Sequence, residues 1–376
     1  MIPLLLRKVA TVAAAASSVG FIFASMDCNP DLFLYHWIFQ RRNNQAFAGQ
    51  CVWIVGASSG IGEELAYRLS SSAARLILSS RSEAKLQTVA RRCQLKHPQC
   101  AIEILPLDVS QSTQSGSDDY YWQEKLQKLP SFPDIIVLNA GKGHLSPVTE
   151  TKVSVMNDMM QTNALWIMTF LPAFLQYRSR YFEQNNHHHQ ASQASKLPHL
   201  VVTSSVAGIL PVPLSASYAA SKHAVMGYLR SFQAECPDQI RIDIICPGPI
   251  DTNFHVNSAA ERKTNKGHMI DRAGATKPSP LKMPIERCVD LMMTAMDRPS
   301  RTGREVWIAQ QPTLMALYLQ QFMPGLLSWS LRRVVGPKRV QLWQEGLDLY
   351  DPESWKRISS RSNPNAAKKD GKQPKP

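Results

Sequence analysis

The glycine-rich segment at residues 56–62 (Gly-Ala-Ser-Ser-Gly-Ile-Gly) constrains the fold more than any other part of the sequence. It follows a short apolar run, residues 51–55, and opens a helix-like stretch, residues 60–71. Glycines at such a turn let the chain bend sharply, and they let a pyrophosphate approach the backbone without meeting a Cβ atom. The helix N-terminus then presents unpaired N–H groups and a partial positive charge to the phosphates. The segment therefore predicts a dinucleotide-binding α/β domain, with an ordinary strand–helix turn as the alternative.

Strand-like and helix-like stretches alternate after Gly49. Strands are expected at residues 51–55, 76–79, 102–107, 135–138, 200–203, 240–246 and 305–309, and helices at 60–71, 82–97, 153–177 (interrupted by Pro172), 216–235 and 285–296. This order predicts an α/β fold with a Rossmann-type, doubly wound parallel sheet. With 44% apolar and 19% charged residues, the 376-residue chain suits one large globular core. Two polar segments, residues 111–119 and 178–196, are predicted to be surface insertions.

The N-terminal region predicts a membrane anchor. Residues 9–26 carry no charge and follow Arg7 and Lys8. Their number is near the lower limit of the ~17–25 residues that cross a bilayer. A second apolar run, residues 32–39, carries aromatic side chains and precedes an arginine pair, which is typical of an interfacial segment. A secretory-pathway signal peptide cleaved near Ala24, or another targeting segment, is the alternative.

The remaining composition limits the partners. The net charge of +13 suits an anionic surface, but no nucleic-acid-binding motif is present, so no nucleic-acid partner is expected. The seven cysteines form no Cys-x-x-Cys pair, which argues against a zinc site or a disulfide framework. The histidine run at residues 187–189 lies in a Gln- and Asn-rich stretch, and no metal site is predicted there.

Tyr218 and Lys222 are the candidate catalytic pair. They stand four positions apart on a predicted helix and so project from one face. A free phenol is a poor base at neutral pH, and a nearby ammonium is expected to lower the pKa of Tyr218. Tyr218 then exchanges a proton with a carbonyl or alcohol oxygen while hydride moves to or from a nicotinamide. A solvated pair on a surface helix is the alternative.

Two further polar residues surround this pair. Ser205 directly follows a predicted strand, at the strand end where ligands gather in parallel sheets, and its hydroxyl is placed to hold a substrate oxygen. Asn163 lies inside a predicted apolar helix and needs polar partners, which indicates a packed network or a held water.

Arg81 bears on the choice of cofactor. A carboxylate at the end of the second strand selects NAD(H), but this chain has Ser79-Ser80-Arg81 there. Because a guanidinium matches phosphate geometry, Arg81 predicts NADP(H) over NAD(H). A solvated arginine at a helix start is the alternative.

These residues together resemble the short-chain dehydrogenase/reductase family over about residues 50–309. The motifs that carry the resemblance are the segment at 56–62, Asn139-Ala140-Gly141, Asn163, Ser205, Tyr218, Lys222 and Pro247-Gly248. The resemblance implies that Tyr218 is the acid/base, that Lys222 binds the ribose and tunes Tyr218, that Ser205 positions the carbonyl, and that Asn163 supports a water-linked proton relay. It implies a cofactor site made of Gly56, Ser58, Ser59, Gly60, Ile61, Gly62, Arg81, Asp108, Asn139, Ala140, Gly141, Tyr218, Lys222, Pro247, Gly248, Ile250 and Thr252. In that site Asp108 contacts the adenine and Thr252 the nicotinamide carboxamide.

One position departs from the family pattern. Val55 stands where the family usually has Thr, whose hydroxyl ties the first strand to the Asn139 loop. The departure puts local rigidity in doubt rather than the reaction.

The chain further resembles a membrane-associated branch of the family. That resemblance rests on residues 60–67, 220–224, 245–249 and 305–308. It implies a reductase of lipophilic carbonyls, such as steroids and retinoids, anchored in the endoplasmic reticulum. A catalytically inactive cofactor-binding scaffold is the alternative function, and a homodimer is left open.

The expected organisation has four parts. Residues 1–48 form the membrane anchor and interfacial segment, 49–310 the single catalytic domain, 311–361 a helical extension and 362–376 a disordered basic tail. Within the extension, residues 313–335 are apolar and aromatic, and two interpretations stay open. They form an interfacial helix pair that admits a membrane-dissolved substrate, or helices packed on the domain or on a dimer partner.

Overall fold

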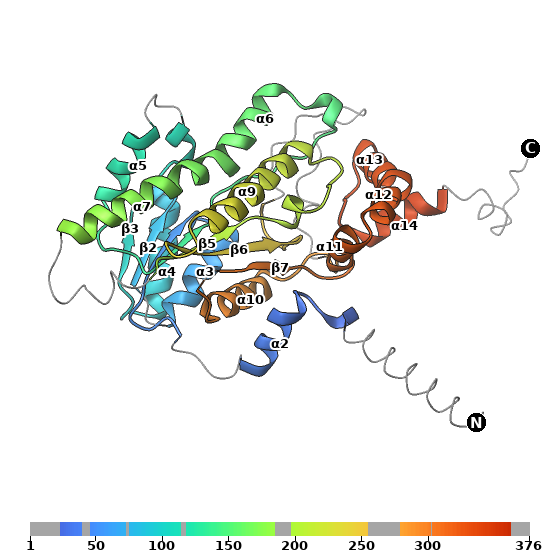
Figure 1. Cartoon of the computed structure of the whole chain (residues 1–376). Coiled ribbons are helices and arrows are strands. Elements are labelled where there is room, and N and C mark those ends of the chain that lie inside the picture. The colour runs from blue at the N-terminus through green and yellow to red at the C-terminus, as the bar shows by residue number, and fades with distance from the viewer. Residues whose placement is uncertain are drawn as a thin grey trace, which may run out of the picture.

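The computed structural model describes residues 23–39, 46–72, 75–113, 118–184, 197–254, 279–301 and 303–361. In this part of the chain, seven parallel strands form one sheet in the order β3-β2-β1-β4-β5-β6-β7 (Figure 1). The strands are β1 (Cys51–Val55), β2 (Arg75–Ser79), β3 (Ile102–Ile104), β4 (Ile135–Leu138), β5 (His199–Thr203), β6 (Arg241–Pro247) and β7 (Glu305–Ile308). The predicted doubly wound parallel sheet is confirmed. Its order reverses between β1 and β4, which is where such sheets bind ligands.

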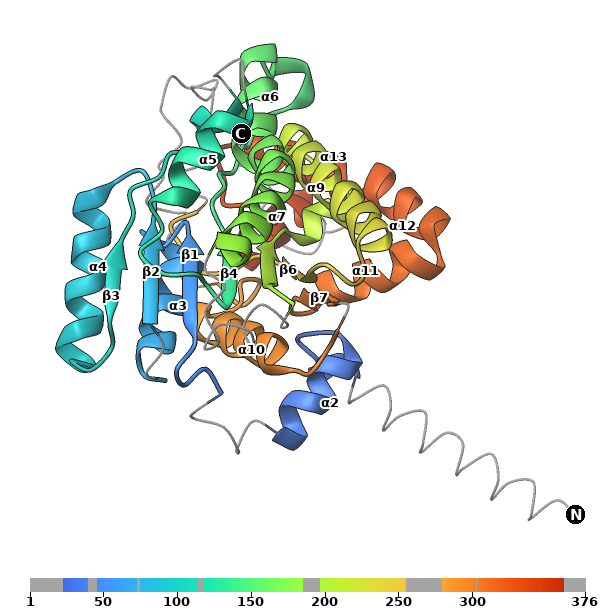
Figure 2. The ribbon, with the colours of Figure 1, turned by 60° about the vertical axis from the view of Figure 1, so that its left-hand side comes forward.

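Helices cover both faces of the sheet (Figures 1 and 2). One face holds α2 (Pro30–Phe39), α3 (Gly60–Ser70), α4 (Glu83–Lys96) and α10 (Ile285–Asp297), and the other holds α5 (Asp118–Gln127), α6 (Val153–Met160), α7 (Trp166–Gln184) and α9 (Ala216–Glu235). Successive side chains of β1 alternate between the two faces: Val52 and Ile54 join the first core cluster, and Trp53 joins the second. The continuous apolar run in the sequence therefore marks a strand buried on both sides.

The strand and helix limits agree with the prediction to within a few residues, except at β3, α5 and α7. β3 ends at Ile104 rather than Leu107, although Leu105 and Leu107 still donate backbone hydrogen bonds to the chain of β2. Helix α5 was not predicted, because the polar residues that precede it suggested only a surface insertion. It forms because Trp122, which is fully buried, packs against the rings of Trp166 and Phe170.

The predicted interruption at Pro172 is wrong. Helix α7 continues through Pro172 to Gln184, so it takes in the first part of the 178–196 segment that was predicted to be an insertion. Proline leaves the carbonyl four residues earlier without its helical donor. Here the Tyr228 hydroxyl of α9 donates to that carbonyl, Met168 O, at 3.0 Å. The irregular turn is instead a π-helical turn, Gln161–Leu165, between α6 and α7.

The N-terminal helix α2 is fastened to α10. Cys28 and Leu32 are fully buried, and Arg287 donates to the Asp27 carboxylate at 2.7 and 3.1 Å. His36 Nδ1 lies 2.8 Å from Thr294 Oγ1. Residues 9–22 of the predicted anchor lie outside the described residues. Among the helices that the structure describes, none has both the length and the apolar character needed to cross a bilayer.

The C-terminal extension forms a helical group beside β7 (Figure 1). It consists of α11 (Thr313–Phe322), α12 (Pro324–Ser330), a π-helical turn (Leu331–Val335), α13 (Gly336–Gln344) and α14 (Pro352–Arg361). Two apolar clusters attach it to the domain: Leu314, Leu317 and Leu327 pack with Val206 and Leu210, and Leu342, Trp343, Leu349 and Ile358 pack with Leu214. Residues 185–196, which include the histidine run, and the basic tail 362–376 lie outside the described residues.

Candidate active site

The ends of neighbouring strands bring the predicted site residues to one edge of the sheet. Gly56 follows β1, Asn139 follows β4, Ser205 stands two residues after β5, and Pro247 ends β6. Because all the strands are parallel, their carboxyl ends share an edge, and ligands bind at this edge in open α/β sheets. The predicted cofactor and catalytic residues therefore converge there.

The glycine loop is packed so tightly that a Cβ atom on either of two of its glycines would clash with neighbouring atoms. Gly56 has φ +97°, and a Cβ atom on it would lie 2.6 Å from Ala140 N. A Cβ atom on Gly62 would lie 2.2 Å from the Gly56 carbonyl oxygen and 2.8 Å from Asn139 Nδ2. The glycine loop, which leads into α3, therefore packs directly against the segment Asn139–Ala140 that follows β4.

The change from Thr to Val55 does not leave this loop loose. Asn139 N donates to Val55 O at 2.9 Å, and Asn139 Nδ2 donates to Gly56 O at 3.2 Å. Backbone and amide bonds thus make the connection for which a hydroxyl was expected.

The other residues of the predicted cofactor site surround this loop. Ser58 and Ile61 are half-buried and Ser59 is exposed. Gly60, Thr252 and Ile285 line a pocket together with Asp251 and Asn253. Ile250 is buried and bridges Met283, and Gly248 N donates to Ile308 O at 2.8 Å. The segment that follows β6 thus lies beside the glycine loop.

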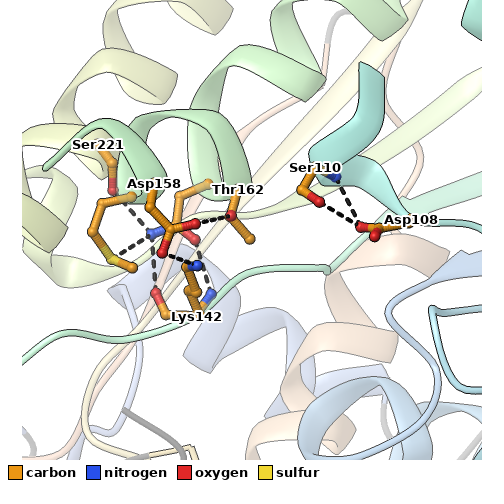
Figure 3. Close-up of polar contacts among 8 residues, drawn as sticks. Asp108, Ser110, Lys142, Asp158, Thr162 and Ser221 are labelled. Carbon is orange, nitrogen blue, oxygen red and sulfur yellow. Dashed lines mark hydrogen bonds and ion pairs between the residues drawn. The ribbon is translucent and has the colours of Figure 1, made fainter. Parts of the chain in front are cut away.

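Arg81 and Asp108 lie farther out along the same edge. Arg81 follows β2, is exposed, and makes no ion pair with another residue of the described ranges. Asp108 Oδ1 accepts hydrogen bonds from Ser110 N at 3.1 Å and Ser110 Oγ at 2.8 Å (Figure 3). The Tyr121 hydroxyl donates to Asp108 O at 2.6 Å. Asp108 is therefore fixed in place, whereas no carboxylate of the described residues occupies the Arg81 guanidinium.

Lys222 points from α9 back toward the cofactor edge. It is buried, its Nζ donates to Thr203 O at 3.0 Å, and it lies 6.0 Å from the Tyr218 ring centroid. A Cβ atom on Gly141 would lie 3.7 Å from this Nζ. Burial lowers the pKa of Lys222 to about 8.

The expected lowering of the Tyr218 pKa by Lys222 is not what the structure gives. Burial raises the pKa of Tyr218 to about 12, and the neighbouring Ser205 side chain opposes that rise only in part. The phenol is therefore protonated at neutral pH. Ser205 itself is held from both sides, because its Oγ accepts from Ala207 N at 3.1 Å and lies 3.4 Å from Pro247 O.

Asn163 joins the catalytic helix to the cofactor edge. It lies fully buried in the π-helical turn, with Oδ1 accepting from Lys142 N at 2.8 Å and Nδ2 donating to Lys142 O and to Ser221 Oγ, each at 3.0 Å. Ser221 Oγ in turn donates to Tyr218 O at 2.7 Å. Figure 3 labels Ser221 and Lys142 of this network and shows the Lys142–Asp158 ion pair beside them. The side chain thus serves as a clamp, and its part in a proton relay stays a prediction.

Lys142 and Ser221 were missed as positioning residues. Ser221 stands between Tyr218 and Lys222 in the sequence, so its place near the site was visible, but its partner Asn163 was not. The apolar helix around Asn163 was the one signal that a polar contact had to exist.

Comparison with known proteins agrees with this geometry. The short chain dehydrogenase family profile matches residues 50–263. Dehydrogenase/reductase SDR family member 7 of Homo sapiens is 34% identical over 314 residues, which cover 82% of this chain and 84% of the relative. The chain belongs to the short-chain dehydrogenase/reductase family. Dehydrogenase/reductase SDR family member 7B of Danio rerio is 27% identical, covering 78% of this chain and 88% of that relative.

Solved structures show the same fold. A short-chain dehydrogenase from Sphingobium yanoikuyae in complex with NADPH matches with a TM-score of 0.54 and 20% identity, covering 74% of this chain and 95% of that one. A family member from Burkholderia phymatum in complex with NAD matches with a TM-score of 0.58 and 20% identity, covering 75% and 96%. As a short-chain dehydrogenase/reductase, the chain is an oxidoreductase whose fold holds a nicotinamide cofactor.

Proposed function

We propose that this short-chain dehydrogenase/reductase uses NADP(H) to interconvert a carbonyl and an alcohol on a lipophilic substrate at a membrane, with the endoplasmic reticulum as its location. The observation that carries the reaction is the placement of Ser205, Tyr218 and Lys222 beside the glycine loop. The bound nicotinamide supplies or accepts the hydride. Tyr218 gives its proton to the carbonyl oxygen, the Ser205 hydroxyl orients that oxygen, and Lys222 binds the ribose hydroxyls.

Replacing Tyr218 by Phe tests the reaction. We expect turnover to fall by about 10²–10⁴-fold, because general acid catalysis is lost while the ring and its packing remain. NADPH oxidation with a panel of ketones measures the effect, and Tyr120→Phe, which changes an exposed tyrosine, is the matched control. Unchanged turnover in Tyr218→Phe would contradict the mechanism. A wild-type protein that binds NADPH but reduces no carbonyl would favour the inactive scaffold instead.

Arg81 supports the cofactor preference. It stands exposed after β2, where no carboxylate is present to bind ribose hydroxyls. Arg81→Ala is expected to reduce the NADPH over NADH ratio of kcat/KM by about 10–100-fold, because a charge-assisted hydrogen bond to the 2′-phosphate is lost. Arg91→Ala, which removes an exposed arginine of α4, is the control. A wild-type preference for NADH would overturn the assignment.

Exposed apolar side chains support membrane association. Such side chains gather on α2 (Leu34, Trp37, Ile38 and Phe39) and on α11–α12 with the residue between them (Phe322, Met323, Leu326 and Trp329). Phe23, at the end of the uncharged N-terminal stretch, packs against Tyr318 of α11 at 5.3 Å between ring centroids. Phe23 therefore lies beside one of the two exposed apolar surfaces.

Vesicle flotation tests this association. We expect the full chain to float with liposomes, and Phe322→Gln together with Trp329→Gln to weaken flotation of a chain that lacks residues 1–22. Equal flotation of the truncated chain with and without these two substitutions would remove the C-terminal helices from the membrane contact. A homodimer stays a prediction that sedimentation of the full chain tests.

A further inference from the structure

The C-terminal extension brings Tyr350 to the active site. Tyr350 packs in the apolar cluster that joins α13 and α14 to Leu145 and Leu214, and Leu214 stands four residues before Tyr218. Ser146 N donates to Leu214 O at 2.8 Å, so the two segments that line this side are fastened together. Tyr350 is also close enough to Tyr218 to contribute to the raised pKa of its phenol. The extension thus packs against the segment that leads into Tyr218.

Two cationic side chains lie against the Tyr350 ring. Lys282 Nζ is 5.3 Å from its centroid and Arg339 Cζ is 5.8 Å from it. Lys282 directly precedes Met283, which bridges Ile250 on the segment that follows β6. Two basic side chains therefore lie on the Tyr350 ring, and one of them borders the segment that follows β6.

The charge of Arg339 is not neutralised within the described ranges. Its Nε and Nη2 atoms are buried and have no hydrogen-bond partner there, and no carboxylate forms an ion pair with it. Two nearby carboxylates of the extension accept hydrogen bonds from the chain around them: Asp348 from Tyr350 N, and Asp351 from Glu353 N and the Ser354 side chain. Arg339 is half-buried as a whole, but leaving these two N–H groups without an acceptor is costly, whereas an oxyanion satisfies two guanidinium donors at once.

We propose that Arg339, packed against Tyr350, binds an anionic group of the substrate, so that the enzyme acts on an amphiphilic carbonyl compound with a carboxylate or sulfate at a distance from the reacting oxygen. The proposal rests on the carbonyl chemistry proposed above and names its substrate class. The half-buried Tyr350 ring and Leu145 side chain contact the apolar part of such a molecule. Tyr218 and Ser205 meet its carbonyl.

Matched substrate pairs test the proposal with the full-length protein in detergent. The pairs are a long-chain oxo-carboxylic acid with its methyl ester, and a ketosteroid sulfate with the parent ketosteroid, so the two arms distinguish carboxylate from sulfate. We expect wild-type kcat/KM to favour the anionic member of at least one pair. Arg339→Gln should lower kcat/KM for that member by about 10–100-fold, mainly through KM, and leave its neutral partner unchanged. Arg339→Lys should retain part of the preference.

An exposed arginine of the same extension provides the control, because Arg333→Gln removes one positive charge without touching the site. Equal kcat/KM for the two members of both pairs, or an equal loss for both members in Arg339→Gln, would overturn the proposal and leave Arg339 a packing residue. Calorimetric binding of the same pairs separates the two hypotheses. If anionic compounds bind selectively through Arg339 but are not turned over, the carbonyl chemistry is wrong and the subsite stands. If carbonyl compounds are turned over without anion selectivity, the subsite is wrong and the carbonyl chemistry stands.

Discussion

The cofactor side and the substrate side of the active site are built differently. On the cofactor side, backbone lies against backbone: Gly56 and Gly62 leave no space for a methyl group beside Ala140 and Asn139. On the substrate side, side chains from α13 and α14 meet Leu214 in a small apolar cluster. The backbone contacts of the glycine loop exclude larger residues, whereas the apolar cluster around Leu214 tolerates exchange of one apolar side chain for another.

The most severe test of the cofactor side is Gly62→Ala. The added Cβ would lie 2.2 Å from the Gly56 carbonyl oxygen, so the loop must shift. We expect NADPH affinity to fall by about 100-fold or more, which corresponds to overpacking of about 3 kcal/mol. Fluorescence titration of NADPH measures this loss.

Gly227→Ala is the matched control. Gly227 lies inside α9 with open space around it, and alanine there should stabilise the helix by about 0.5–1 kcal/mol. If Gly62→Ala binds NADPH as the wild type does, the loop is less constrained than the structure indicates.

Leu342→Ala tests the substrate side. Leu342 is fully buried in the cluster with Leu214. We expect a loss of about 2 kcal/mol, at the low end for leucine because the small peripheral cluster can collapse into the space. Denaturant unfolding measures the stability, and steady-state kinetics should show altered kcat/KM for carbonyl substrates with unchanged NADPH affinity. A parallel loss of NADPH affinity would show that the two sides are not independent.

Lys222 lies between the two sides and gives the smallest effect, on stability. The pKa of Lys222 is about 8 in the folded protein and 10.5 ordinarily. Below pH 8 the folded protein therefore carries a buried ammonium, which lowers its free energy of unfolding. That penalty is relieved as the pH rises from about 8 to 10.5, because the unfolded chain binds more protons in this window. We therefore expect Lys222→Met to be more stable than the wild type at pH 7 by about 1–2 kcal/mol, after the lost hydrogen bond to Thr203 offsets part of the gain.

Urea unfolding of the cofactor-free protein between pH 7 and 10.5 measures this effect. The difference between variant and wild type should narrow as the pH rises. A difference that is constant with pH would show that the buried charge does not cause it.

Much of the fold and of the site follows from local sequence. The glycine spacing at residues 56–62, the apolar strands and the four-residue step from Tyr218 to Lys222 each depend on neighbours along the chain, and the structure gives them the expected form. The local sequence predicted a helix wrongly where a contact with a distant residue determines whether that helix forms or continues. Pro172 does not break α7 because the Tyr228 hydroxyl satisfies the freed carbonyl, and α5 forms because Trp122 meets Trp166 and Phe170.

The sequence by itself determined the sheet, the glycine loop and the placement of Tyr218 and Lys222 on one helix, because turns and periodicity are set by adjacent residues. Only the tertiary structure decided how these parts act. Burial raises the pKa of Tyr218 where the charge of Lys222 had predicted a fall, and Asn163 clamps Lys142 and Ser221. Only packing brings Tyr350 to Leu214 and Arg339 to the Tyr350 ring, because contacts between segments far apart in the chain depend on the folded core and leave no periodic signal in the sequence.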